Sequence, residues 1–148
     1  LILSASIIYG SLLYGFQHSA AGGNESSTMM LAQEYIKQEN YEQAYDVLTK
    51  YIVEAGKPSL EVYFALSFVE IKLNKLDDAK SHLLKVIQLD PNLPEAYYNL
   101  ALLHLEENNL KEAKSNAEKA AELKPSQQEY SDLVQELNRL RPSSDGEE

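Results

Sequence analysis

Residues 94–127 read PEAYYNLALLHLEENNLKEAKSNAEKAAELKPSQ, and residues 60–93 read LEVYFALSFVEIKLNKLDDAKSHLLKVIQLDPNL. Laid on each other without a gap, the two stretches share 11 identical residues in 34 positions. A weaker copy covers about residues 25–59 and needs one extra residue near Gly56 to stay in register. An internal repeat of this period is typical of an array of small helical repeats.

Each repeat has the apolar spacing of a pair of helices. In the second repeat, positions 63, 66, 67 and 70 recur as on one face of a helix, and a polar turn at Asn74-Lys75 follows. A second helical face ends at Asp90-Pro91. Such a hairpin cannot bury its apolar face alone, so three of them are predicted to stack into an all-α solenoid. Small residues stand where the two helices must cross closely: Ala32, Ser67 and Ala101 in the first helix, and Ala44, Ala79 and Ala113 in the second.

In these residues the chain resembles the tetratricopeptide repeat (TPR) family. The resemblance covers residues 25–127 and implies a TPR-type α-solenoid of three hairpins, TPR 1 (25–59), TPR 2 (60–93) and TPR 3 (94–127). The chain departs from the family pattern at Glu70 and His104, which replace an expected aromatic residue, and at Thr28. The third repeat carries the family's consensus residues at Tyr97, Leu100, Ala101, Ala113, Ala117, Ala120 and Pro125.

The repeats are followed by an amphipathic segment over residues 128–141. Residues 126–129 read Ser-Gln-Gln-Glu, which is the pattern of a helix-starting capping box. Arrays of the resembled family commonly end in such a helix, which caps the open apolar end of the last hairpin. The acidic residues 142–148 are too polar to pack and are expected to be mobile.

The segment before the repeats is apolar, and residues 1–16 carry no charge. As a helix they would span about 24 Å, somewhat short of a hydrocarbon core of roughly 30 Å. Three interpretations stay open: a retained transmembrane signal-anchor helix over residues 1–19, a secretory signal cleaved near Ser19–Ala21, and a buried core helix. We expect the first of these, with a flexible linker over residues 20–27.

The first basic residue after this segment is Lys37. Nearby basic residues hold a flanking loop in the cytoplasm, so their absence favours translocation of the repeats. We therefore expect a single-pass membrane protein whose TPR domain lies on the periplasmic, lumenal or extracellular side.

Composition and spacing argue against nucleic-acid binding and catalysis. The chain has 13 basic and 23 acidic residues, a net charge of −10, which disfavours contact with a phosphate backbone. It has no cysteine, no pair of histidines four residues apart, and no glycine-rich loop among the repeats. We therefore expect a non-enzymatic protein with no catalytic residues, no metal and no cofactor.

The resemblance implies that the first helix of each hairpin lines a concave groove for a partner protein. Its centre would be an apolar strip suited to an apolar or amphipathic segment, with Lys37, Lys72 and Glu95 as a polar rim. The alternative is that these residues pack on neighbouring hairpins, or that a helix of the chain fills the groove. The predicted groove residues are Met29, Gln33, Ile36, Lys37, Phe64, Phe68, Ile71, Lys72, Glu95, Tyr98, Leu102 and Leu105.

Acidic tails of heat-shock chaperones are expected to be poor ligands. Family members that bind them hold the carboxylates with lysine, arginine and asparagine. At the matching positions this chain has Met29, Gln33, Ala65, Glu95 and Asn99, of which Asn99 alone could donate usefully and Glu95 would repel.

Two functions are compatible with these features. The favoured one is a membrane-tethered scaffold that serves as a subunit or assembly factor of a larger membrane complex. The alternative is a soluble, secreted or periplasmic chaperone-like accessory domain that carries a signal peptide.

Overall fold

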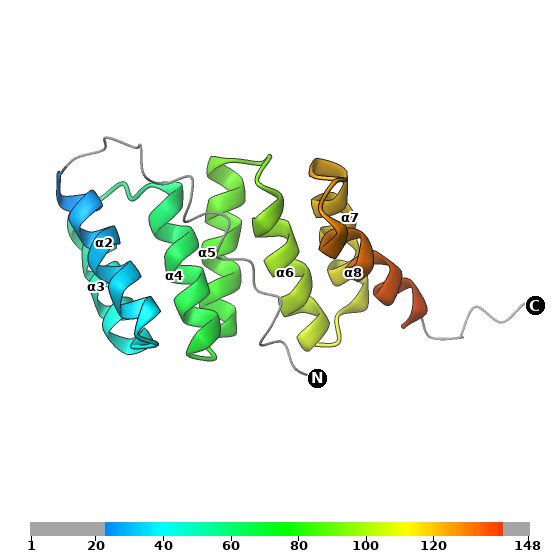
Figure 1. The fold of residues 1–148 in the computed structure, drawn as a ribbon, viewed down its shortest axis with the longest axis horizontal. Coiled ribbons are helices and arrows are strands. Elements are labelled where there is room, and N and C mark those ends of the chain that lie inside the picture. Colours follow the sequence, from blue (N-terminus) through cyan, green and yellow to red (C-terminus); the bar gives the residue numbers. More distant parts are fainter. Residues whose placement is uncertain (1–22, 141–148) are drawn as a thin grey trace, which may run out of the picture. The chain divides into compact units, whose positions relative to one another are not determined.

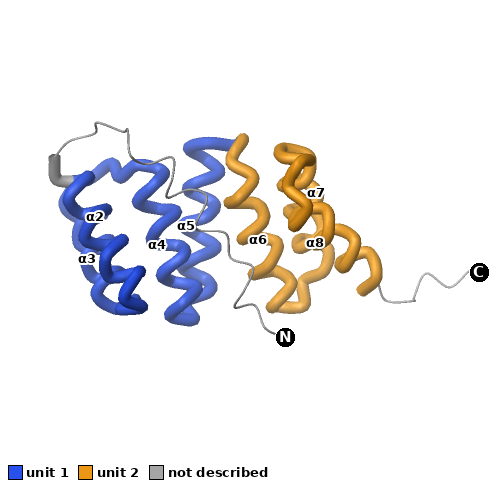
Figure 2. The backbone as a smooth tube through the Cα atoms, in the orientation of Figure 1, with its two compact units in different colours: residues 1–91 blue, residues 92–148 orange. Residues whose placement is uncertain are grey.

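The structure is a computed structural model and describes residues 23–140. Within this range it contains seven α-helices and no strand (Figure 1). The helices form two compact units, unit 1 ending at Pro91 and unit 2 beginning at Asn92 (Figure 2). They are α2 (Gly23–Lys37), α3 (Tyr41–Ala55), α4 (Leu60–Lys72), α5 (Leu76–Leu89), α6 (Pro94–Glu106), α7 (Leu110–Leu123) and α8 (Gln128–Arg139).

Within each unit the helices pair as the repeats predict. In unit 1, α2 packs against α3, α4 packs against α5, and α3 also packs against α4. In unit 2, α6 packs against α7, and α8 packs against α7. The predicted all-α array of helical hairpins is therefore confirmed.

The small residues predicted to lie at the helix crossings are buried. All six of them are fully buried, at 0% exposure. A larger side chain at these positions would push the two helix axes apart, because helices this close interdigitate their side-chain ridges. The residues are Ala32, Ser67 and Ala101 in the first helices, and Ala44, Ala79 and Ala113 in the second helices.

The turn inside each hairpin has one residue in the left-handed region. Glu39, Asn74 and Asn108 each have a φ of 58°. In every case the next N–H donates to the carbonyl oxygen five residues earlier, at 2.8 Å, which closes the first helix. Asparagine tolerates this conformation well, whereas glutamate does not.

Two predicted boundaries differ from the structure. α2 begins at Gly23, so residues 23–27 are helical instead of belonging to the linker predicted over residues 20–27. The Tyr51 hydroxyl donates to the Glu25 carboxylate at 2.7 Å and ties the first turns of α2 to α3. The capping box at residues 126–129 is wrong: Gln127 is the N-cap of α8, without a side-chain capping bond, and its amide donates to Glu129 instead, at 2.9 Å.

The predicted transmembrane segment (residues 1–19) and acidic tail (residues 142–148) lie outside the described residues. Among the helices of residues 23–140, none has the length and hydrophobicity needed to cross a membrane.

Candidate functional site

The first helices of the second and third hairpins are buried on more sides than the second helices. α4 buries eight of its 13 residues and α6 buries nine of 13. α5 and α7 each bury three of 14, on a single stripe. A helix that is apolar all round needs cover beyond the face that meets its hairpin partner. α4 and α6 therefore each carry a second apolar face, and this second face is the candidate site.

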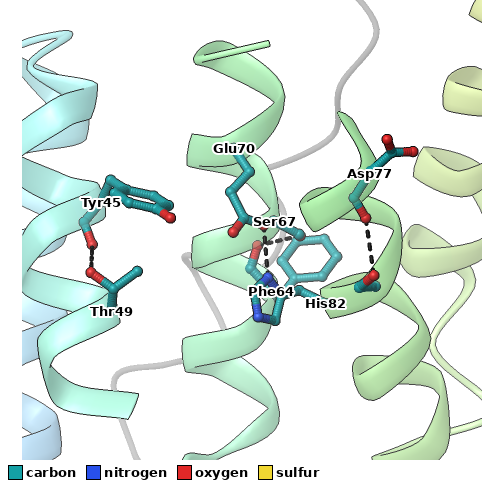
Figure 3. Close-up of polar contacts among 8 residues, drawn as sticks. Tyr45, Thr49, Phe64, Ser67, Glu70, Asp77 and His82 are labelled. Atoms are coloured by element: carbon teal, nitrogen blue, oxygen red, sulfur yellow. Dashed lines mark hydrogen bonds and ion pairs between the residues drawn. The ribbon is translucent and has the colours of Figure 1, made fainter. Parts of the chain in front are cut away.

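The face of α4 that meets α5 is marked by a polar contact. One oxygen of the Glu70 carboxylate lies 2.8 Å from Nδ1 of His82, as Figure 3 shows. The Tyr63 ring stacks on the same imidazole, with centroids 5.7 Å apart. The Ser67 hydroxyl donates to the Phe64 carbonyl at 2.7 Å, so it needs no partner on α5. Tyr63 and Glu70 thus belong to the intrahairpin face.

Phe64 and Phe68 stand on a different row of α4. Their side chains are 1% and 8% exposed. Tyr41, at the start of α3, meets the Phe68 ring edge-on at 6.4 Å, and Nζ of Lys72 lies 5.5 Å from the centre of the same ring. Burial, followed by the charge of Glu39, raises the pKa of Tyr41. Phe68 is therefore packed in the core of unit 1.

In unit 2 the corresponding row of α6 contains Tyr98 and Leu102, which are 3% and 6% exposed. The Tyr98 ring contacts the ring of Tyr130 in α8, with centroids 5.0 Å apart. The C-terminal helix of the chain therefore covers part of this face. This observation agrees with the alternative that a helix of the chain packs on the predicted strip.

The predicted site residues thus have a buried centre and a partly exposed border. The expectation of an exposed apolar strip is wrong, because helical spacing places a residue on a face without showing what packs on that face. Glu95, predicted to lie on the polar rim, is also buried at 6% exposure, whereas Lys37 is exposed. The half-buried members are Met29, Gln33, Ile36, Ile71, Lys72 and Leu105.

A buried polar cluster in unit 2 was not foreseen. Nζ of Lys124 lies 3.5 Å from the Glu95 carboxylate, and burial, followed by the Glu95 charge, raises the pKa of Tyr130. Asn99, one helical turn after Glu95, is 1% exposed. Within the described part of the chain, neither amide atom of Asn99 nor the Tyr130 hydroxyl has a hydrogen-bond partner. Such groups are rare in native interiors and call for an explanation.

The histidines do not form a catalytic or metal-binding arrangement in the described residues. His104 is partly buried and its Nδ1 lies 3.7 Å from the Glu107 carboxylate. Among residues 25–140, no three histidine, cysteine, aspartate or glutamate side chains are grouped to hold a metal ion. The Glu70–His82 pair was missed because its members are 12 residues apart. A glutamate at a predicted core position was the one available signal.

Comparison with known sequence families gives three matches. The models described as TPR repeat and tetratricopeptide repeat match residues 69–108 and 94–127. A third model, described as anaphase-promoting complex, cyclosome, subunit 3, matches residues 3–86, more than half of the chain. The chain is a TPR protein of the anaphase-promoting complex, cyclosome, subunit 3 family. Membership describes the repeat architecture and does not by itself make this TPR protein a subunit of that complex.

Solved TPR structures share the fold. The first TPR domain of Spaghetti (RPAP3), bound to the HSP90 peptide SRMEEVD, is 20% identical with a TM-score of 0.71, covering 78% of this chain and 91% of that one. The Yersinia enterocolitica secretion chaperone SycD, in complex with a peptide of the translocator YopD, is 19% identical with a TM-score of 0.72, covering 82% and 98%. MamA is 22% identical with a TM-score of 0.73, covering 78% and 67%.

At these identities the likeness shows the fold alone. No curated protein sequence matches the chain. The matched family models describe tetratricopeptide repeats and a subunit of a protein complex, and none of them describes an enzymatic family.

Proposed function

We propose that this TPR protein is an interaction scaffold for apolar or amphipathic peptide segments. The second apolar face of α4 is the proposed binding surface of unit 1, and that of α6 is the proposed binding surface of unit 2. The observation that carries the proposal is that each of these helices has a second apolar face whose border is only half-buried, at Ile71 and Lys72 on α4 and at Leu105 on α6. A peptide helix with anchors at i, i+3, i+4 and i+7 suits such a surface.

The similar structures support peptide binding as such. The RPAP3 domain is seen with an HSP90 peptide, and SycD is seen with a peptide of the translocator YopD. The HSP90 peptide SRMEEVD is acidic at its C-terminal end. A ligand of that kind would face the buried Glu95 carboxylate in this chain. We therefore favour apolar segments over acidic tails as ligands.

Because the central side chains are buried, a peptide must compete with contacts inside the chain. On α6 the competing contact includes the Tyr130 ring, and on α4 it includes Tyr41 and Lys72. The apparent affinity is then reduced by the free energy needed to expose these faces.

The scaffold is proposed to act at a membrane, as a subunit or assembly factor of a larger complex. The uncharged residues 1–16 would anchor it, and the absence of a lysine or arginine between this segment and Lys37 favours translocation of the repeats. Alkaline carbonate extraction tests the anchor, which should keep the protein in the membrane fraction. Release into the supernatant, with an intact mass that starts at Ala21 or Gly22, would instead identify the secreted accessory domain.

The binding face is tested by combining Phe68→Ala with Leu102→Ala and recovering co-purifying proteins in mild detergent. We expect capture to be lost while circular dichroism stays helical. Leu84→Ala is the matched control, since Leu84 is 58% exposed on α5 and its truncation should leave capture unchanged. Each buried truncation costs about 2–5 kcal/mol, so melting curves must accompany the assay. A folded double variant that captures its partner at full strength would refute the proposed site.

A further inference from the structure

Glu95 and Asn99 lie one turn apart on α6 and therefore share a face of unit 2. Both side chains are buried, at 6% and 1% exposure. The Asn99 amide offers one acceptor oxygen and two donor hydrogens, and neither atom is satisfied among the described residues. The position therefore offers a hydrogen-bonding group that no described part of the chain uses.

The Glu95 carboxylate is held by a cation that can be replaced. Nζ of Lys124 lies 3.5 Å from Oε1, at the outer limit of a hydrogen bond. Lys124 is the C-cap residue that follows α7, and its side chain is 40% exposed. A buried carboxylate gains more from a closer cation with several donors than from this long contact.

The third residue of the site is the aromatic side chain of Tyr130. Tyr130 is fully buried and packs against Tyr98. Burial and the neighbouring Glu95 charge raise the pKa of Tyr130, so the phenol stays neutral and does not compete with Glu95 for a cation. Tyr130 therefore borders Glu95 as a neutral aromatic side chain.

Resting on the proposed peptide-binding function, we infer that Glu95 and Asn99 form a recognition site for an arginine side chain of the bound peptide, with Lys124 as the resident cation that it replaces. A guanidinium group presents five N–H donors in a planar fork. It can therefore donate to the Glu95 carboxylate and to the Asn99 amide oxygen together. The Asn99 nitrogen is left to donate to a carbonyl of the peptide. The net charge of −10 favours the approach of a basic segment.

The test uses the full chain in mild detergent and two labelled synthetic peptides. Both are amphipathic helices of leucine and alanine, one with a single arginine and the other with citrulline, which keeps the shape and removes the charge. Fluorescence anisotropy should show the arginine peptide binding at least tenfold more tightly. Glu95→Gln should abolish this ratio, and Lys124→Met should increase arginine affinity severalfold. Glu136→Gln, at an exposed carboxylate of α8, is the matched control and should leave the ratio unchanged.

The outcomes separate this inference from the function on which it rests. Equal binding of the two peptides by the native chain overturns the arginine site and leaves the scaffold function standing. Binding of neither peptide overturns both. If Glu95→Gln weakens both peptides equally, Glu95 has a structural role only and the inference is overturned. A tighter arginine complex in Lys124→Met supports it, because a purely structural ion pair would not raise affinity when removed.

Discussion

One oxygen of the Glu70 carboxylate lies 2.8 Å from Nδ1 of His82, between α4 and α5, and the Glu70 side chain is only 1% exposed. Which group donates in this contact depends on the tautomer of the imidazole. This contact occupies the position where the TPR pattern has an aromatic residue. The pair is not repeated in unit 2, where His104 and Asn116 take the matching positions and Asn116 donates to the Glu112 carbonyl at 2.8 Å.

His82→Phe is expected to lower the free energy of unfolding by about 3 kcal/mol, because it leaves a buried carboxylate without its partner. Phenylalanine keeps a ring against Tyr63, so the loss reports the hydrogen bond and not the stacking. Urea denaturation measures it. Combining the change with Glu70→Leu should recover most of the loss. If the single variant has the same urea midpoint of unfolding as the native chain, the pair makes no net contribution to stability.

Glu39→Gly is expected to stabilise the protein by about 1 kcal/mol, since glycine adopts a φ of 58° without the steric cost that glutamate meets. Glu39→Asn should give a smaller gain and make this turn resemble those of the other two hairpins. Asn74→Ala is the opposite change at the matching turn and should destabilise. Thermal melting checks all three, and a lower melting temperature for Glu39→Gly would contradict the strain argument.

Tyr130→Phe removes a buried hydroxyl beside the Glu95 carboxylate, and its effect is expected in the pH dependence of the free energy of unfolding. The raised pKa of Tyr130 means that the folded chain keeps this proton when the unfolded chain loses it. The contribution of the protonated Tyr130 side chain to the free energy of unfolding is complete below about pH 10. It is lost as the pH rises further, by up to about 1.4 kcal/mol per pH unit. The variant should lose less stability between pH 9 and 11 in urea titrations; equal alkaline slopes would exclude Tyr130 as the cause.

Tyr51→Phe is the contrasting tyrosine variant. The Tyr51 hydroxyl donates to Glu25, and this bond, followed by burial, raises the pKa of Tyr51. Its removal should destabilise unit 1 at neutral pH by about 1 kcal/mol. Hydrogen exchange should show faster opening at the start of α2. Unchanged protection of those amides would mean that the bond does not hold the first turns of α2.

Ala113→Leu is expected to cost about 1–3 kcal/mol, because the side chain is fully buried where α6 and α7 cross. Ser115→Leu is the control, since Ser115 is exposed on the same helix and its replacement should change the melting temperature little. An unchanged melting curve for Ala113→Leu would show that this crossing is looser than its burial indicates.

The helices could be predicted because their signals are local. The apolar spacing in each repeat and the polar turns at Asn74 and Asn108 lie within a few residues of the structure that they specify. The start of α2 could not be read in this way. Its first turns include the small and polar residues 23–27, and they are tied to α3 by the contact between Glu25 and Tyr51, 26 residues later.

The candidate site could be predicted only in part. Helical spacing put Phe64, Phe68 and Leu102 on the expected rows of the first helices. It did not show that all three are buried, because the residues that pack over them lie elsewhere in the chain. In the sequence, Asn99 is one of the positions that match the carboxylate-binding residues of other family members. That its amide has no hydrogen-bond partner among the described residues is visible only in three dimensions.

The sequence by itself determined the helical hairpins: an internal period of 34 residues, recurring small residues and apolar stripes at helical spacing predict a pair of helices in each repeat. The tertiary structure decided which polar groups meet and which apolar faces are covered. Glu95 with Lys124 and Tyr98 with Tyr130 are each joined across about 30 residues and from different helices. Periodicity sets the side of a helix on which a residue lies, whereas burial and pairing depend on what the rest of the chain brings to that side.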